Sequence, residues 1–152
     1  MELDLLFSFG AVICYAYLFN VPIKSTLIAG FAGSIAWMIS NFWIAQPVFA
    51  IAIAAFTIGI IAYLAAPRIQ EPVTTVIIPA IIVLVPGIAS YNALRYAIEG
   101  DSAASIQGVI TVISATLSIA GGLSVSELIM LRINRIINNY IKRKERQKMN
   151  RL

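Results

Sequence analysis

The sequence contains no histidine and a single cysteine, Cys14, among its 152 residues. Without histidine, serine-protease-type catalysis and histidine-ligated metal sites are excluded, and one cysteine cannot form an internal disulfide. Charged residues are scarce as well, at 12% of the chain, against about a quarter in soluble domains. Since no metal-ligand cluster, nucleophile–base pair or phosphate-binding loop is visible, we expect neither an enzyme nor a bound cofactor or metal.

Apolar residues, in contrast, make up 60% of the chain, and the mean hydropathy is +0.88. Apolar runs of about 18 or more residues are typical of membrane-spanning helices, and several occur here. These runs do not alternate between apolar and polar residues, as the strands of a membrane β-barrel would. The sequence therefore predicts an all-α integral membrane protein.

Five transmembrane helices are predicted, separated by polar or proline-containing turns. Their approximate ranges are 3–20, 26–45, 48–66, 73–98 and 102–126. Residues 1–126 would thus form a transmembrane domain, and 127–152 a basic amphipathic helix in the cytoplasm. The apolar face of this helix recurs at helical spacing, at Ile129, Ile133, Ile136, Ile137, Tyr140 and Ile141. Its basic residues are Arg132, Arg135, Lys142, Arg143, Lys144, Arg146 and Lys148.

The distribution of charge predicts the orientation. Lys24, Arg68 and the basic cluster follow the first, third and fifth spans, and cytoplasmic loops carry an excess of Lys and Arg. We therefore expect the N-terminus outside and the C-terminus inside a bacterial-type cytoplasmic membrane, with Arg95 as the exception. The basic helix is expected to contact anionic lipid headgroups rather than nucleic acid. The opposite side carries acidic residues: Glu2, Asp4, Glu99 and Asp101.

The fourth span contains two prolines, Pro79 and Pro86, and a glycine, Gly87, directly after the second. Proline lacks the N–H that a helix needs, so each one deprives a carbonyl of its donor. One reading is a kinked structural helix. The other is a discontinuous helix of the kind that lines substrate sites in transporters, broken at Pro86–Gly87 and facing protein or a water-filled cavity.

Polar residues gather just after this break. Asn92, Arg95 and Glu99 share one helix face, and Tyr91 lies one turn before Arg95. Arg95 and Glu99 are spaced for an ion pair. Arg95 either anchors the helix end at the membrane surface or binds a substrate carboxylate with its two-pronged guanidinium. In the second case Glu99 or Asp101 is a candidate for carrying a coupling proton.

Two spans carry small residues at intervals of four. Such spacing lets helix backbones approach closely, so helix packing is the expected role. A long face of small residues also suits a partner subunit or a second copy of the chain. The predicted packing residues are Gly30, Ser34, Ser114, Ser118 and Gly122.

The segment 67–101 resembles the C-terminal half of the threonine/serine exporter family. The matching features are an arginine-containing loop (Arg68) that ends in Pro72, an apolar run through Pro79 into the "LVPG" of 84–87, and "GD" at 100–101. In that family this half occurs fused to a larger half or as a separate small subunit, and the length and number of spans resemble the small subunit. The resemblance implies export of threonine and serine, or of dicarboxylates, driven by the proton gradient.

Together these observations predict a subunit of a membrane exporter that works with a larger partner of the same family. A substrate carboxylate would meet the Pro86–Gly87 break and Arg95. The alternative is a non-transporting accessory or scaffold subunit that stabilises the larger partner.

Overall fold

The computed structural model describes residues 2–42 and 46–149, and the side chains within 3–42 and 46–136. Over these residues the chain forms six α-helices and one 3₁₀ helix, and no strand. The elements are α1 (Glu2–Leu18), α2 (Ile23–Phe42), α3 (Pro47–Ile69), α4 (Thr74–Ala80), η1 (Ile81–Leu84), α5 (Gly87–Glu99) and α6 (Ser102–Met149).

Within the described residues, three helices are long and apolar enough to cross a membrane: α2, α3 and the 102–136 part of α6. The segments Thr74–Leu84 and Gly87–Glu99 make a fourth if they form one bent span. α1 is apolar but has 17 residues, which is about 25 Å of helix against a hydrocarbon core of about 30 Å. The all-α membrane architecture agrees with the prediction, and the count of five spans stays a prediction.

The α3–α6 contact is the most extensive between any two helices. A side chain at Gly122 would collide with the carbonyl oxygen of Ala52, and a side chain at Gly59 with the hydroxyl of Ser126. Ala52 precedes Gly59 on α3, and their contacts Gly122 and Ser126 follow in the same order on α6. The two helices therefore run parallel. This is the direction that the third and fifth crossings of a five-span chain must share.

α1 and α2 run antiparallel, because Val12 lies against Gly33 while Ser8, one turn earlier on α1, bonds to Ser34, later on α2 (3.5 Å). α2 also packs on α3, and α4 with η1 lies against α2 and α3. The core between these helices consists largely of small side chains, which lets the helix backbones approach closely. Its fully buried alanines are Ala29, Ala32, Ala36, Ala54, Ala55, Ala62 and Ala80.

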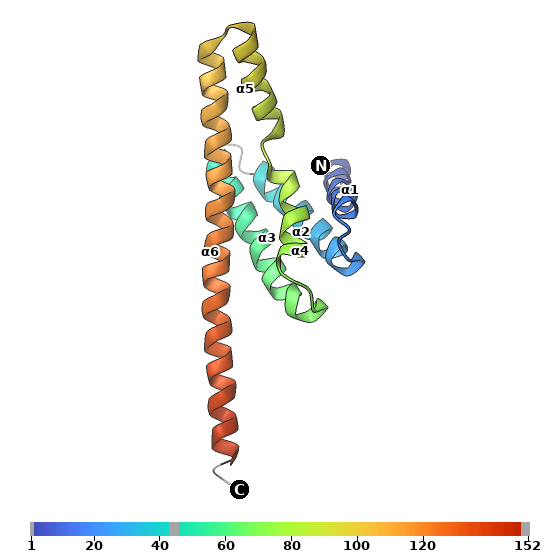
Figure 1. Ribbon diagram of the computed structural model, residues 1–152, viewed down its shortest axis with the longest axis vertical. Coiled ribbons are helices and arrows are strands. Elements are labelled where there is room, and N and C mark those ends of the chain that lie inside the picture. Colours follow the sequence, from blue (N-terminus) through green and yellow to red (C-terminus); the bar gives the residue numbers. More distant parts are fainter. Residues whose placement is uncertain (1, 43–45, 150–152) are drawn as a thin grey trace.

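α5 and the start of α6 form a helical hairpin that rises beyond the other helices (Figure 1). Of the described helices, α5 packs extensively against α6 alone. The hydroxyl of Ser105 donates a hydrogen bond to the carbonyl oxygen of Ala93 (3.0 Å), and a side chain at Gly108 would lie 2.8 Å from the Ala93 Cβ. The hairpin is thus held together by close contact between its own two helices.

The C-terminal segment is helical to Met149, but it is not a separate helix. α6 has 48 residues, about 72 Å at 1.5 Å per residue, and it passes residue 126 without a break. Its lower end therefore continues along the axis of the membrane-crossing part (Figure 1). Ile129, Ile133 and Ile136 are exposed there, while the side chains predicted to complete the apolar and basic faces, from 137 onward, lie outside the described ones.

One further boundary differs from the prediction. α3 continues to Ile69, so Pro67 lies inside the helix and the polar connector begins at Gln70, whose φ of 59° ends the helix in the left-handed region. The second predicted span was extended to residue 45, and residues 43–45 lie outside the described residues.

Candidate functional site

The fourth predicted span consists of three pieces. α4 ends at Ala80, the 3₁₀ helix η1 follows, and α5 begins at Gly87, with an angle of 49° between the segments on either side of the break. Val85 has extended backbone (ψ 127°), as the residue before a proline prefers. The predicted break at Pro86–Gly87 is present, whereas the 3₁₀ segment before it was not predicted.

The three residues assigned to this break lie in different environments. Pro79 is fully buried in the core, inside α4. Pro86 is half-buried, and Gly87 has open space around its Cβ position. Gly87 is not among the glycines with a positive φ.

Some backbone N–H and carbonyl groups at the break form hydrogen bonds with residues two or three positions away. The Val85 N–H donates to the carbonyl oxygen of Ile82 (3.4 Å), and the Gly87 N–H to that of Val85 (2.8 Å). Pro86 has no N–H for the Ile82 carbonyl oxygen, as predicted, and the N–H of Val85, one residue earlier, bonds to that oxygen instead. The carbonyl oxygen of Pro86 accepts from both the N–H and the hydroxyl of Ser90, which starts the first turn of α5 without a side-chain cap at its N-terminus.

The polar residues of α5 lie on the projecting hairpin. Arg95 Nε donates to Glu99 Oε1 at 2.8 Å, and both side chains are about half exposed, at 53% and 50%. The guanidinium carbon of Arg95 also lies 5.8 Å from the centroid of the Tyr96 ring, within the range of a cation–π contact. Tyr91 is exposed and Asn92 half-buried.

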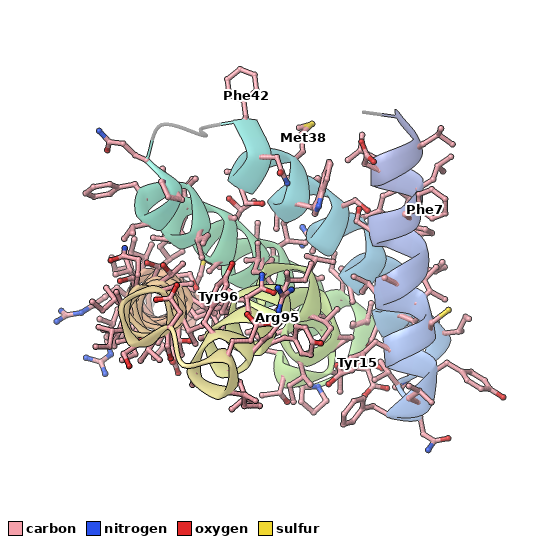
Figure 2. The ribbon with its side chains drawn as sticks, turned by 90° about the horizontal axis from the view of Figure 1, so that it is seen from above. Phe7, Tyr15, Met38, Phe42, Arg95 and Tyr96 are labelled. Atoms are coloured by element: carbon pink, nitrogen blue, oxygen red, sulfur yellow. The ribbon has the colours of Figure 1, made fainter. Side chains whose placement is uncertain are left out.

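Seen from above, Arg95 and Tyr96 lie between α6 and α1, toward the middle of the bundle outline (Figure 2). Arg95 thus overhangs the end of the bundle from which the hairpin rises. A guanidinium has five N–H donors, so the bond to Glu99 does not exhaust its capacity to bind a carboxylate. Tyr96 was missed by the sequence argument, although its place next to Arg95 in the chain could have suggested it.

Gly100 and Asp101 form the turn of the hairpin. Gly100 has a φ of 84°, in the left-handed region that favours glycine, and its N–H bonds to the carbonyls at the end of α5. Asp101 Oδ1 accepts a hydrogen bond from the Ala104 N–H at 3.0 Å, which caps the start of α6. The "GD" pair therefore has a structural role that explains why these two residue types stand together.

We expect Asp101→Asn to leave stability within about 0.5 kcal/mol of the wild type, because asparagine caps a helix as well as aspartate does, and Asp101→Ala to cost about 1 kcal/mol. Reversible unfolding in mixed detergent micelles measures both. Asp101→Asn also removes the titrating group while keeping the cap. Proton-driven export by this variant at the wild-type rate would contradict a coupling role for Asp101.

The predicted packing residues lie at helix contacts to different degrees. Gly30 lies against the Phe9 ring, and the half-buried Ser34 donates to the Gly30 carbonyl oxygen (3.0 Å). Gly122 faces α3 directly, and Ser118 is buried. Ser114 is half-buried, with its hydroxyl bonded to the Ile110 carbonyl oxygen of its own helix.

The described part of the chain contains no group of three or more His, Cys, Asp or Glu side chains that could hold a metal ion. Its polar chemistry at the hairpin consists of the Arg95–Glu99 pair, the neighbouring tyrosines and the first turn of α5. Such an arrangement can bind an anionic group.

A model of one protein family, described as "Threonine/Serine exporter, ThrE", matches residues 4–129. The match covers α1 to α5 and the part of α6 that packs on α3 and α5. No curated protein and no solved structure matches the chain.

Proposed function

The chain belongs to the threonine/serine exporter family, and on that premise we propose that it is a membrane subunit that exports small amino acids of the threonine/serine type. Dicarboxylates are the second substrate class. The subunit works with a larger partner of the same family in a bacterial-type cytoplasmic membrane, and the proton gradient drives export. Membership of an exporter family indicates a transporter rather than an enzyme.

The observation that carries the proposal, beyond the family itself, is the broken fourth span. A span interrupted at Pro86–Gly87 and bent by 49° matches the discontinuous helices that form substrate sites in secondary transporters. The first turn of α5 presents the positive end of a helix dipole. Arg95 lies eight residues later on the same helix, about 12 Å along its axis. A carboxylate that passes the break would meet these two positive features in turn.

The exposed apolar surface of the hairpin supports a partner. Ile88 is 81% exposed and Ile98 is 79% exposed, on a helix that its own chain covers only on the α6 side. An apolar helix face beside a charged pair fits a protein neighbour better than lipid alone, because Arg95 and Glu99 then remain close to polar groups or water. The same surface would also serve a scaffold subunit that only stabilises the larger partner.

Efflux measurements test the proposal. Proteoliposomes or cells containing this chain, the larger partner, or both are loaded with labelled serine, threonine or succinate, and the initial efflux rate is followed with and without a proton gradient. We expect efflux of serine or threonine that needs both subunits and collapses when the gradient is dissipated. Export by the larger partner alone at the full rate would contradict a transport role and favour the scaffold.

A further inference from the structure

A pocket of about 300 Å³ opens between α1, α2 and η1. Its lining residues are Asp4, Phe7, Ser8, Trp37 and Val83. The pocket lies at the end of the bundle from which the α5–α6 hairpin rises, since Asp4 is near the start of α1 and Val83 is next to the end of η1 (Figure 1). Its volume is at the lower end of the range of ligand sites, which suits a small solute.

One turn from Trp37 on α2, next to the pocket, the helices are closely packed. A Cβ at Gly33 would lie 2.7 Å from Val12 Cγ2, 3.3 Å from the carbonyl oxygen of Ala80 and 3.7 Å from Val83 Cγ2. α1, α2 and the broken span therefore meet at Gly33. Trp37 is one helical turn beyond Gly33 on α2, on the same face, because residues four apart share a helix face.

Two polar residues of α1, Ser8 and Asp4, line the same pocket. Because α1 is antiparallel to α2, Ser8 and then Asp4 precede Val12 by one and two turns on its face. Ser8 is only 6% exposed, and its hydroxyl donates to the Leu5 carbonyl oxygen at 2.9 Å. Asp4 is exposed and also lines the pocket.

The chemistry of this lining selects a cation. A carboxylate forms charge-assisted hydrogen bonds with an ammonium group, and Trp is the aromatic side chain with the strongest attraction for cations. The Ser8 oxygen adds acceptor capacity at depth.

We infer that the pocket formed by Asp4, Ser8 and Trp37 binds the ammonium group of a small zwitterionic solute. The inference rests on the proposed function and extends it, because it assigns the positive end of the substrate to a different place from the carboxylate-binding residues of α5. Val83 connects the pocket to the segment just before the break, so an occupied pocket contacts the broken span directly.

Trp37 supplies a direct reading of binding. In the full-length chain with Trp43→Phe, which leaves Trp37 as the one tryptophan, the purified protein in lipid nanodiscs is titrated with serine, ethanolamine, glycerate and sodium chloride. We expect a saturable change in Trp37 emission with serine and with ethanolamine, which keeps the amine but lacks the carboxylate. Glycerate, which lacks the amine, and sodium chloride should cause none.

Substitutions of Asp4 test whether its negative charge is needed for binding, and Asp101→Asn is the matched control. Asp4→Asn should raise the Kd for serine and ethanolamine at least tenfold, Asp4→Glu should restore part of the affinity, and Asp101→Asn, at the same end of the protein, should leave it unchanged. Circular dichroism and size-exclusion profiles confirm that the variants are folded. A wild type without a saturable signal, an unchanged Kd in Asp4→Asn, or saturation by glycerate or sodium would each overturn the inference.

Failure of the pocket and failure of the exporter are separable. If the chain exports serine while Asp4→Asn keeps the wild-type KM and Kd, the pocket is wrong and the exporter stands. If serine and ethanolamine bind in an Asp4-dependent way but no efflux occurs with the partner present, the pocket stands and the proposed function is wrong.

Discussion

Replacing Gly122 with alanine is expected to separate α6 from α3 and to destabilise the protein by about 3 kcal/mol, the upper end of the range for overpacked sites. The added Cβ would collide with the Ala52 carbonyl oxygen and would lie 3.0 Å from both the Ala55 Cβ and the Phe56 backbone nitrogen. Two of these three neighbours are backbone atoms, which cannot rotate away as a side-chain end could. The strain must therefore move a helix in the most extensive contact of the bundle.

The adjacent glycine is a matched control. Gly121 has nothing within 4 Å of its Cβ position, and Gly→Ala in a helix is favourable by about 0.5–1 kcal/mol. Gly121→Ala should thus be neutral or stabilising. Both variants are compared by SDS titration in mixed micelles, followed by circular dichroism. Equal midpoints for the two variants would contradict the parallel α3–α6 packing described above.

Replacing Arg95 with alanine is expected to reduce export 10- to 100-fold while the fold and the assembly with the larger partner remain intact. The loss of one charge-assisted bond to a substrate is worth about 1.5–3 kcal/mol, which corresponds to that range. The ion pair with Glu99 is exposed and contributes about 0–1 kcal/mol to stability. Arg95→Ala should therefore lower the export rate strongly and change the stability of the fold very little.

Initial efflux rates and co-purification with the partner measure the two effects separately. Glu99→Gln is the control, because it removes the ion pair but keeps the guanidinium. A wild-type export rate in Arg95→Ala would mean that Arg95 only anchors the helix end. Loss of co-purification would point to the scaffold role instead.

Local signals in the sequence were sufficient for the elements themselves. Apolar runs predicted helices that cross a membrane, and Pro86 predicted the break in the fourth one, because a missing N–H and a fixed φ act at the residue that carries them. The family followed from the residues between Arg68 and Asp101, and the family match over 4–129 confirms it. These conclusions need only neighbours along the chain.

Other features depend on segments that are distant along the chain. Pro79 and Pro86 were assigned to one substrate path by their spacing, and the structure buries Pro79 by packing α4 against α2 and α3. Asp101, one of two candidates for a coupling proton, also caps the start of α6. Gly87 stands at the break with open space around its Cβ position. Residue type and spacing suggested roles for these positions, whereas their surroundings follow from how the helices pack.

By itself the sequence determined that this chain is helical, membrane-embedded, broken at Pro86–Gly87 and a member of an exporter family, because hydropathy, proline and motif spacing are properties of short stretches. Only the tertiary structure decided that α5 projects on a hairpin, that α3 and α6 run parallel through Gly59 and Gly122, and that Asp4, Ser8 and Trp37 line one pocket. The residues of that pocket stand about thirty positions apart on antiparallel helices. No local pattern marks such a meeting, since it depends on which turn of one helix packs against which turn of the next.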